Sequence, residues 1–260
     1  MSGAVPERVS TPLELVAEPS TGRVFETERR VRLGDASPGG RLRFDALVRY
    51  LQDVSDDDTR DAGFMSATGW VVRRTTIRVE SFPTYLEPMT MRTWCSATGA
   101  RWAERRISVR GGLGGRIDSA TLWVHVDPVA MRPAVLPEEF HDTYGPATQG
   151  RRIRANLHHG DPPTPQDVDP AIRRASWTPR FCDFDVLGHV NNSNYWTVVE
   201  EELSRRRDLR APLVAEVEHR DALGAGATAD VTVVDGANSM RLWLCEDGSL
   251  RASASVEVIS

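Results

Sequence analysis

The sequence predicts an α+β protein built from two copies of one module, in which a long helix is wrapped by antiparallel strands. Three observations support this fold class. The order of strand, turn, helix and four strands occurs twice within 260 residues. No helical periodicity interrupts the strands of either copy, which favours antiparallel pairing over a doubly wound parallel sheet. A segment rich in Pro and Gly, residues 137–176, separates the two copies.

The first copy begins after a polar stretch that ends near residue 21. Alternating residues predict a strand over 24–33, and a Ser-Pro-Gly-Gly turn follows at 37–40. A helix ending near residue 63 is predicted next, because apolar residues recur at helical spacing. These residues are Leu42, Phe44, Leu47, Val48, Leu51 and Val54. Four strands are expected after the helix, at 70–80, 89–97, 103–110 and 116–126.

The second copy repeats this order. Its predicted elements are a strand at 177–182, a turn at 186–192, a helix at 193–207 and strands at 213–219, 229–234, 240–245 and 250–259. The expected domains are therefore 1–145, a linker at 146–175, and 176–260. Within the linker, His158 and His159 have no neighbouring Cys, Asp or Glu at metal-ligand spacing, so we expect them at the surface.

The two copies superpose without a gap around the turn before each helix. Placing residues 33–35 over 181–183 brings Gly40 onto Gly188 and Arg41 onto His189. Neither copy can easily bury both its helix and its open sheet face alone, so we expect the two sheets to join as an internal pseudo-dimer. Because only the second copy has the histidine, we expect one chemical site in each chain.

Composition excludes several classes of function. A net charge of −5 and a pI near 5.7 leave no basic surface of the kind that nucleic acids require. No stretch approaches the 18 apolar residues of a membrane span, and no apolar leader segment is visible. Three scattered cysteines form neither a disulfide framework nor a zinc motif. We therefore expect a soluble, cytoplasmic protein.

Motifs in both copies carry a resemblance to a known family. The first copy has Tyr50-Leu51-Gln52-Asp53, Trp70-Val71-Val72-Arg73-Arg74, Ser81-Phe82-Pro83-Thr84-Tyr85 and Arg132-Pro133. The second has Asp183-Phe184-Asp185-Val186-Leu187-Gly188-His189-Val190-Asn191-Asn192, followed by Tyr195. With these motifs the sequence resembles the acyl-acyl carrier protein (acyl-ACP) thioesterases, whose fold is a double hotdog: two long helices, each wrapped by antiparallel strands that join into one extended sheet.

The resemblance implies an activity and a partner. Such enzymes hydrolyse a fatty acyl thioester on the pantetheine arm of acyl carrier protein and release a free fatty acid, with no metal or redox cofactor. Asp185 and His189 match the family's active-site aspartate and histidine. Leu187, however, stands where plant members have a catalytic asparagine, and Ala222 where they have a glutamate. Part of the family's network is therefore absent.

Thioester hydrolysis needs a nucleophile, an acceptor for its proton, and donors directed at the developing oxyanion. We expect His189 to activate water, with Asp185 fixing its tautomer. The main-chain N–H groups of Gly188 and Val190 are the expected oxyanion donors, and Asn191 can hold the water. The alternative interpretations are structural: a histidine in a tight turn, with Asp185 and Asn191 as caps.

A carboxylate to replace the one missing at residue 222 can come from the first helix. This helix carries a dense acidic run over 53–61, which is usually a solvated face. On the alternative interpretation, Asp57 or Asp58 faces the thioester and acts as the base.

Two other functions stay open at this stage. One is a related enzyme, either an acyl-CoA thioesterase or a hotdog dehydratase. The other is an acyl-binding protein that kept the fold and lost catalysis. Acyl chain length, the choice of carrier and the association of two chains as a homodimer are not decided by these patterns.

Overall fold

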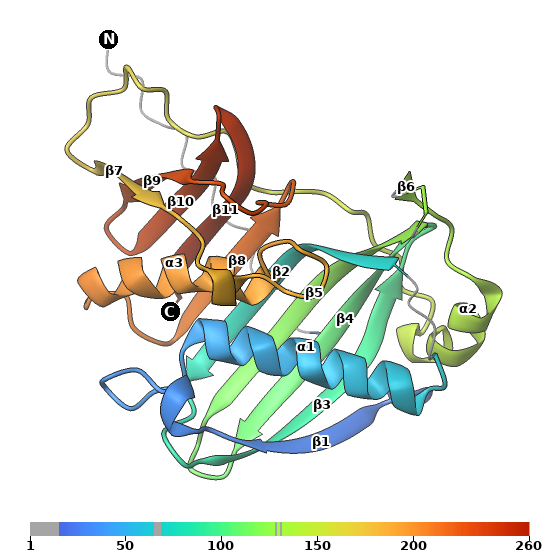
Figure 1. Ribbon diagram of the computed structural model, residues 1–260. Helices are drawn as coiled ribbons and strands as arrows, with labels where there is room; N and C mark the ends of the chain where they lie inside the picture. Colours follow the sequence, from blue (N-terminus) through green and yellow to red (C-terminus); the bar gives the residue numbers. More distant parts are fainter. Residues whose placement is uncertain (1–15, 65–68, 128, 131, 260) are drawn as a thin grey trace.

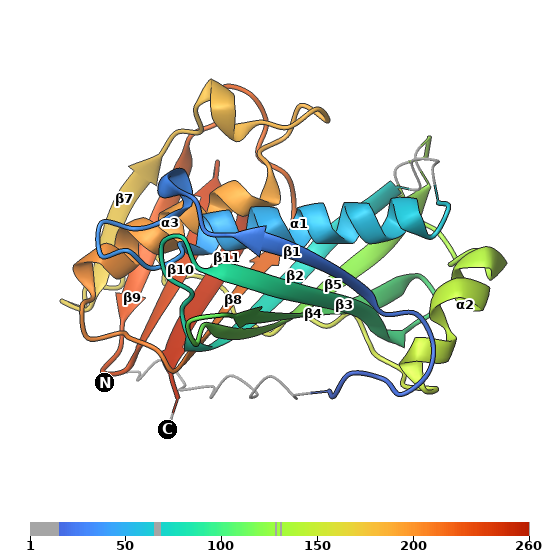
Figure 2. The same cartoon turned by 90° about the horizontal axis from the view of Figure 1, so that it is seen from below.

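The structure is a computed structural model that describes residues 16–64, 69–127, 129–130 and 132–259. Two long helices, α1 (Phe44–Asp61) and α3 (Asn192–Arg205), lie on the same face of one large antiparallel sheet (Figures 1 and 2). No helix in the described part of the chain has both the length and the apolar character that a membrane crossing requires.

The described strands divide between the two halves of the chain. The first half contributes β1 (Phe25–Arg30), β2 (Gly69–Ser81), β3 (Pro88–Thr98), β4 (Trp102–Gly111), β5 (Arg116–Asp127) and the short β6 (Arg132–Pro133). The second half contributes β7 (Ile172–Trp177), β8 (Leu213–His219), β9 (Ala229–Asp235), β10 (Ser239–Glu246) and β11 (Ser249–Val258).

The sheet order shows how the two halves join. It runs β1-β3-β4-β5-β2 and continues β8-β11-β10-β9-β7, so the second half mirrors the first about the β2–β8 pair. In this pair Arg74 lies opposite Glu218 and Val79 opposite Leu213. The predicted fold class, with two helices wrapped by strands that join into one extended sheet, is confirmed. The division at 145 and 176 stays a prediction, because one sheet runs through both halves.

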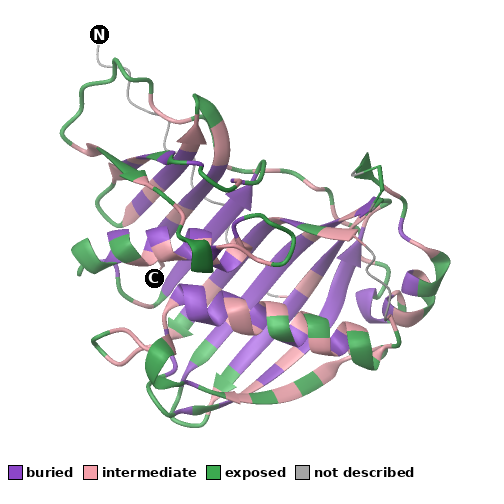
Figure 3. Ribbon diagram, viewed as in Figure 1, coloured by how far each residue is buried: buried purple, intermediate pink, exposed green. Residues whose placement is uncertain are grey.

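Each helix buries the side that its sequence periodicity predicts. In α1, buried Leu47, Leu51 and Val54 follow one another at intervals of three or four residues, so they share a face. In α3, Tyr195 and Val199 do the same. These faces pack on a continuous core that includes residues of both halves. Figure 3 shows buried, intermediate and exposed residues following one another along both helices.

Two elements differ from the sequence predictions. A short helix, α2 (Glu138–Tyr144), lies where a linker was predicted. Its Phe140 and Tyr144, four residues apart, pack in a second small core with Cys95 and Ala103. The strand predicted at 177–182 is β7 and lies five residues earlier, while residues 181–183 form a 3-10 turn. Residues 172–177 show no clear alternation of apolar and polar side chains, and Pro170 precedes them, so the pattern offers little signal for this strand.

The rest of the linker crosses the face of the sheet opposite the helices. We call residues 151–160 the strap. Trp102 Nε1 donates to Ile153 O at one end, and Trp243 Nε1 donates to Gly160 O at the other, each within 2.8 Å. The expectation that the linker histidines lie at the surface is wrong for His159, whose side chain is only 12% exposed. It is confirmed for His158, which is exposed.

Candidate active site

The turn before α3 is closed by its own backbone. Asp185 N–H donates to His189 O at 3.0 Å, and Gly188 N–H donates to Asp185 O at 3.0 Å. Gly188 has a φ of +75°, a conformation that side chains disfavour, which explains a glycine here. Val186 and Leu187 at the tip are exposed. The turn therefore presents its side chains to solvent beside the start of α3 (Figure 3).

The predicted hydrogen bond between the Asp185 carboxylate and the His189 imidazole is absent from the structure, although the backbones of the two residues are bonded. Asp185 Oδ1 accepts the Leu187 N–H at 2.9 Å, and its Oδ2 accepts from Asn191 Nδ2 at 3.3 Å. The His189 imidazole is exposed and makes no hydrogen bond within the described part of the chain. Asp185 thus holds the turn in shape, and His189 is free to meet a ligand.

The main-chain donors expected to bind the oxyanion are already bonded. Gly188 N–H is used within the turn, and Val190 N–H donates to Leu223 O at 3.1 Å. Asn191 is the N-cap of α3, and its Oδ1 accepts from Ser193 N at 2.9 Å. Asn192, the first residue of the helix, has an N–H without a partner among the described residues. The available donor therefore lies two residues later than predicted, at the positive end of the helix dipole.

A small cavity adjoins this helix start. It lies between α1 and the sheet, and its lining residues are Val48, Leu51, Gln52, Ser55, Val72, Thr75, Thr121, Trp123 and Asn192. Its volume of about 10 Å³ is room for about one water molecule. The cavity thus connects the start of α3 in the second half with α1, β2 and β5 of the first half.

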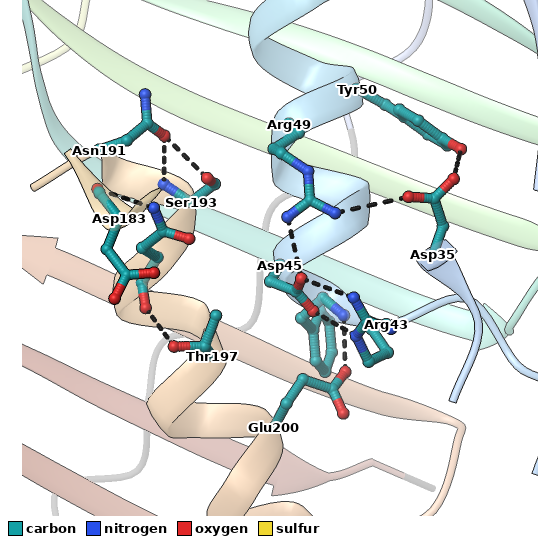
Figure 4. A network of polar contacts seen from close by, with 12 residues as sticks. Asp35, Arg43, Asp45, Arg49, Tyr50, Asp183, Asn191, Ser193, Thr197 and Glu200 are labelled. Carbon is teal, nitrogen blue, oxygen red and sulfur yellow. Dashed lines mark hydrogen bonds and ion pairs between the residues drawn. The ribbon is translucent and has the colours of Figure 1, made fainter. Parts of the chain in front are cut away.

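The corresponding start of α1 is closed by an ion pair. Arg41 Nη1 and Nη2 contact the two carboxylate oxygens of Glu200 on α3, both at 2.8 Å. Glu200 Oε1 also accepts the Phe44 N–H at 2.6 Å. Figure 4 shows the Glu200 side chain extending from α3 toward the start of α1, near Arg43. The Arg41 guanidinium lies over the Phe82 ring, 4.5 Å from its centroid. Glu200 therefore takes the free N–H of this helix start and neutralises the arginine that stands in place of histidine.

The starts of α1 and α3 occupy corresponding positions in the two halves but differ in their hydrogen bonding. The superposition of the two turns pairs Arg41 with His189, Phe44 with Asn192, and Glu200 with Gln52. The first group is fully hydrogen-bonded internally, whereas the His189 imidazole, the Asn192 N–H and the Gln52 amide have no hydrogen bond to any described residue. The sequence motifs contain Gln52 and Asn192 but indicate no catalytic role for them, and none was expected for Glu200. Extending the superposition into the helices pairs Gln52 with Glu200 and Phe44 with Asn192.

The acidic residues of α1 do not lie in this cavity. Asp57 Oδ2 pairs with Arg29 of β1 at 2.7 Å. Asp58 is buried and contacts Arg23, Arg105 and the hydroxyl of Tyr144. Neither lines the cavity, so the role of base predicted for Asp57 is not supported by its position, and Asp58 is committed to a buried ion pair.

The segment after β8 packs against the turn. Leu223 O accepts from Val190 N, and Leu223 N–H donates to the Tyr195 hydroxyl at 3.2 Å. These bonds bring residue 222, an alanine, beside the turn. The neighbouring Asp221 is exposed and pairs with Arg251. Residue 222 therefore brings no carboxylate to the turn, and the carboxylate of Asp221 beside it is paired with Arg251.

A buried histidine lies beneath the start of α3. The His219 ring meets the Tyr195 ring edge-on at 4.9 Å, and its Nε2 is buried without a partner among the described residues. Burial, and to a lesser extent the charge of Arg73, lowers the pKa of His219 to about 3. The ring is therefore neutral at physiological pH.

This lowered pKa predicts a dependence of stability on pH. Below the ordinary histidine pKa of 6.5, His219 is protonated in the unfolded chain, whereas in the folded chain it stays neutral until about pH 3. The free energy of unfolding should therefore fall as pH decreases through this window, by up to about 1.4 kcal/mol per pH unit from this one group. Urea unfolding of His219→Phe and wild type between pH 7 and 4 should show a shallower slope for the variant; equal slopes would contradict this assignment.

One group of side chains on the other face of the sheet has the composition of a metal site. The ligand atoms of His158, Glu216 and Glu218 lie within 4.8 Å of one another. Arg74 Nη1 already lies 2.8 Å from His158 Nε2, and Thr76 donates to Glu216. Burial raises the pKa of Glu216, but hydrogen bonds from His158 and Thr76 outweigh it and leave that pKa below its ordinary value. This group fastens the strap to β8 through its own hydrogen bonds.

Comparisons with known proteins agree with this architecture. The model of the acyl-ACP thioesterase N-terminal domain matches residues 22–144, and that of the C-terminal domain matches residues 168–246. An uncharacterized protein of Mycobacterium tuberculosis is 28% identical over 250 residues, covering 93% of this chain and 95% of its own. A chloroplastic palmitoyl-acyl carrier protein thioesterase of Gossypium hirsutum is 24% identical over 213 residues, covering 73% of this chain and 49% of the plant protein.

Solved structures show the same fold. The 12:0-ACP thioesterase from Umbellularia californica superposes with a TM-score of 0.73 at 22% identity, over 90% of this chain and 96% of that one. An acyl-ACP thioesterase from Bacteroides thetaiotaomicron superposes with a TM-score of 0.68 at 18% identity, over 90% of this chain and 97% of that one. The fold is therefore the double hotdog, and family and fold together support thioester hydrolysis. With family models matching both halves, this chain belongs to the acyl-ACP thioesterase family.

Proposed function

We propose that this protein hydrolyses fatty acyl thioesters of acyl carrier protein and releases the free fatty acid. One observation carries the proposal beyond family membership. Of two corresponding helix starts, one is closed by the Arg41–Glu200 ion pair. At the other, the Asn192 N–H and the Gln52 amide beside the cavity, and the exposed His189 imidazole on the turn, have no hydrogen bond to the described residues. Half-buried polar groups usually have hydrogen-bond partners, so the Asn192 N–H and the Gln52 amide, both of half-buried residues beside one cavity, support a ligand site there.

The geometry supports the following roles for the groups at the start of α3. The Asn192 N–H, with the dipole of α3 behind it, donates to the carbonyl oxygen as negative charge develops there. One such donor typically contributes roughly 3 kcal/mol to the transition state. The exposed imidazole of His189 accepts a proton from the attacking water. Asp185 and Asn191 act through the turn, because each is bonded to its backbone or cap.

The reaction needs no group beyond water and these residues. The oxygen of water bonds to the carbonyl carbon, and the carbon–sulfur bond then breaks. The pantetheine sulfur leaves as a thiolate and takes up the proton that His189 received. The products are a fatty acid and the thiol of the carrier.

The acyl chain extends from this point toward the cavity between α1 and the sheet. Val48, Leu51, Val72 and Trp123 supply apolar wall. Because the cavity holds only about one water molecule, side chains on α1 and the sheet have to move apart before an acyl chain can enter. Chain-length preference then depends on how far this wall can open.

A thiol-release assay tests the proposal. The purified protein is given acyl-ACP and acyl-CoA esters of several chain lengths, together with the 3-hydroxyacyl forms. We expect thiol and free fatty acid from saturated acyl-ACP, at a higher kcat/KM than from the matching CoA ester. Faster release from CoA would favour an acyl-CoA thioesterase, and loss of water from the 3-hydroxyacyl esters a dehydratase. Tight binding of acyl-ACP without thiol release would leave an acyl-binding protein.

A further inference from the structure

We propose that Gln52 of α1 is a catalytic residue whose side-chain Nε2 is a second hydrogen-bond donor to the oxyanion. The inference rests on the proposed function and adds to it a residue from the other half of the chain. Gln52 lines the same cavity as Asn192, although the two residues belong to different halves. Its amide is half-buried and makes no hydrogen bond to any described residue.

The closed helix start shows where a side chain at this place reaches. Glu200 occupies on α3 the position that Gln52 occupies on α1. Its carboxylate meets the first N–H of the opposite helix, at Phe44, within 2.6 Å. The two halves repeat the same backbone hydrogen bonds around their turns, so Gln52 stands in the same relation to the first N–H of α3. An oxygen bound by that N–H is therefore within reach of the Gln52 amide.

The residue type decides what this contact does. A carboxylate accepts the helix N–H for itself, as Glu200 does, and its charge opposes a developing oxyanion. A neutral amide carries two N–H donors and no charge. The Gln52 side-chain oxygen makes no hydrogen bond to the Asn192 N–H among the described contacts, so this N–H stays available, and the Gln52 Nε2 adds a donor of its own. Oxyanion sites commonly use two donors, and each contributes mainly in the transition state.

Two substitutions test this role. Gln52→Leu removes the donor at similar volume, and we expect kcat to fall about 100-fold with little change in KM, because the bond forms mainly in the transition state. Gln52→Glu is almost isosteric but loses the donors and adds a charge, so we expect a larger loss near pH 8. As pH falls and the new carboxyl is protonated, it can donate again. The ratio of its rate to that of wild type should therefore rise.

The counterpart residue supplies the matched control. Glu200→Gln breaks the ion pair with Arg41 and should lower the melting temperature, while kcat stays within about twofold of wild type. Gln52→Leu should lower kcat and leave the melting temperature nearly unchanged, since Gln52 makes no side-chain hydrogen bond to the described residues.

The outcomes separate the two proposals. If wild-type protein releases thiol and both Gln52 variants keep its kcat, the role of Gln52 is excluded while the proposed function stands. Equal losses of kcat in Gln52→Leu and Glu200→Gln would likewise exclude it, because they would point to helix packing. If wild type hydrolyses none of the thioesters, the proposed function fails first and this inference with it.

Discussion

Replacing His189 with alanine should lower kcat/KM for acyl-ACP hydrolysis by about 1,000-fold, within the range that a general base contributes. The imidazole is exposed, lies on the turn that leads into α3, and makes no hydrogen bond to the described residues. Its loss should therefore remove proton transfer without disturbing the fold. The thiol-release assay measures the rate, and a thermal melt should give an unchanged midpoint.

Val186→Ala is the matched control for this prediction. Val186 lies on the same turn with its side chain fully exposed, so its truncation changes the turn without removing a titratable group. We expect wild-type rates from this variant. A His189→Ala protein that keeps its kcat/KM would remove the imidazole from the mechanism, and an equal loss in Val186→Ala would assign the effect to the shape of the turn.

Replacing Asp58 with alanine should destabilise the protein by about 3–5 kcal/mol, the usual cost of leaving a buried charge without its partner. The Asp58 side chain is 1% exposed, and Arg105 beside it is 12% exposed. Arg23 and the Tyr144 hydroxyl also contact this carboxylate, at 2.6 and 3.0 Å. For a chain of this size the loss corresponds to a melting temperature lower by roughly 10 °C.

The neighbouring Asp57 provides the comparison. Its side chain is 44% exposed and pairs with Arg29, so Asp57→Ala should cost less than about 1 kcal/mol. Urea unfolding of both variants measures the difference, and similar losses would refute the assignment. Thiol release from Asp57→Ala at the wild-type rate is also expected, because Asp57 does not line the cavity. A strong loss of rate would restore it as a candidate base.

Local patterns in the sequence predicted most of the fold. The helices were predicted because buried residues such as Leu47 and Leu51 recur at the period of a helix, and the strands because apolar residues alternate. The helix α2 was missed, since seven residues between Pro137 and Gly145 offer only Phe140 and Tyr144 as a periodic signal. The sheet order also needed contacts between distant segments, although the repeat indicated that the two sheets join.

The candidate site was predicted only in part. The motif located the turn and His189, and Asn191 caps the helix as its residue type suggests. The motif indicates Gly188 and Val190 as oxyanion donors, but it does not show which acceptors their N–H groups bind in the folded chain. Their N–H groups are bonded to Asp185 O and Leu223 O, and the latter lies 33 residues away along the chain. The contact between Asp185 and His189 was expected from spacing, but the side chain of Asp185 closes the turn instead.

The sequence by itself determined that two similar modules exist and that the second carries the histidine turn. Tertiary structure decided which helix start is closed by an internal ion pair. Arg41 and Glu200 are 159 residues apart, and they meet only because α1 and α3 pack side by side. Their ion pair closes one helix start, while with glutamine at the corresponding place the first N–H of the other helix has no hydrogen-bond partner among the residues that the structure describes. Hydrogen bonds between distant segments depend on packing, and no local pattern of residues encodes them.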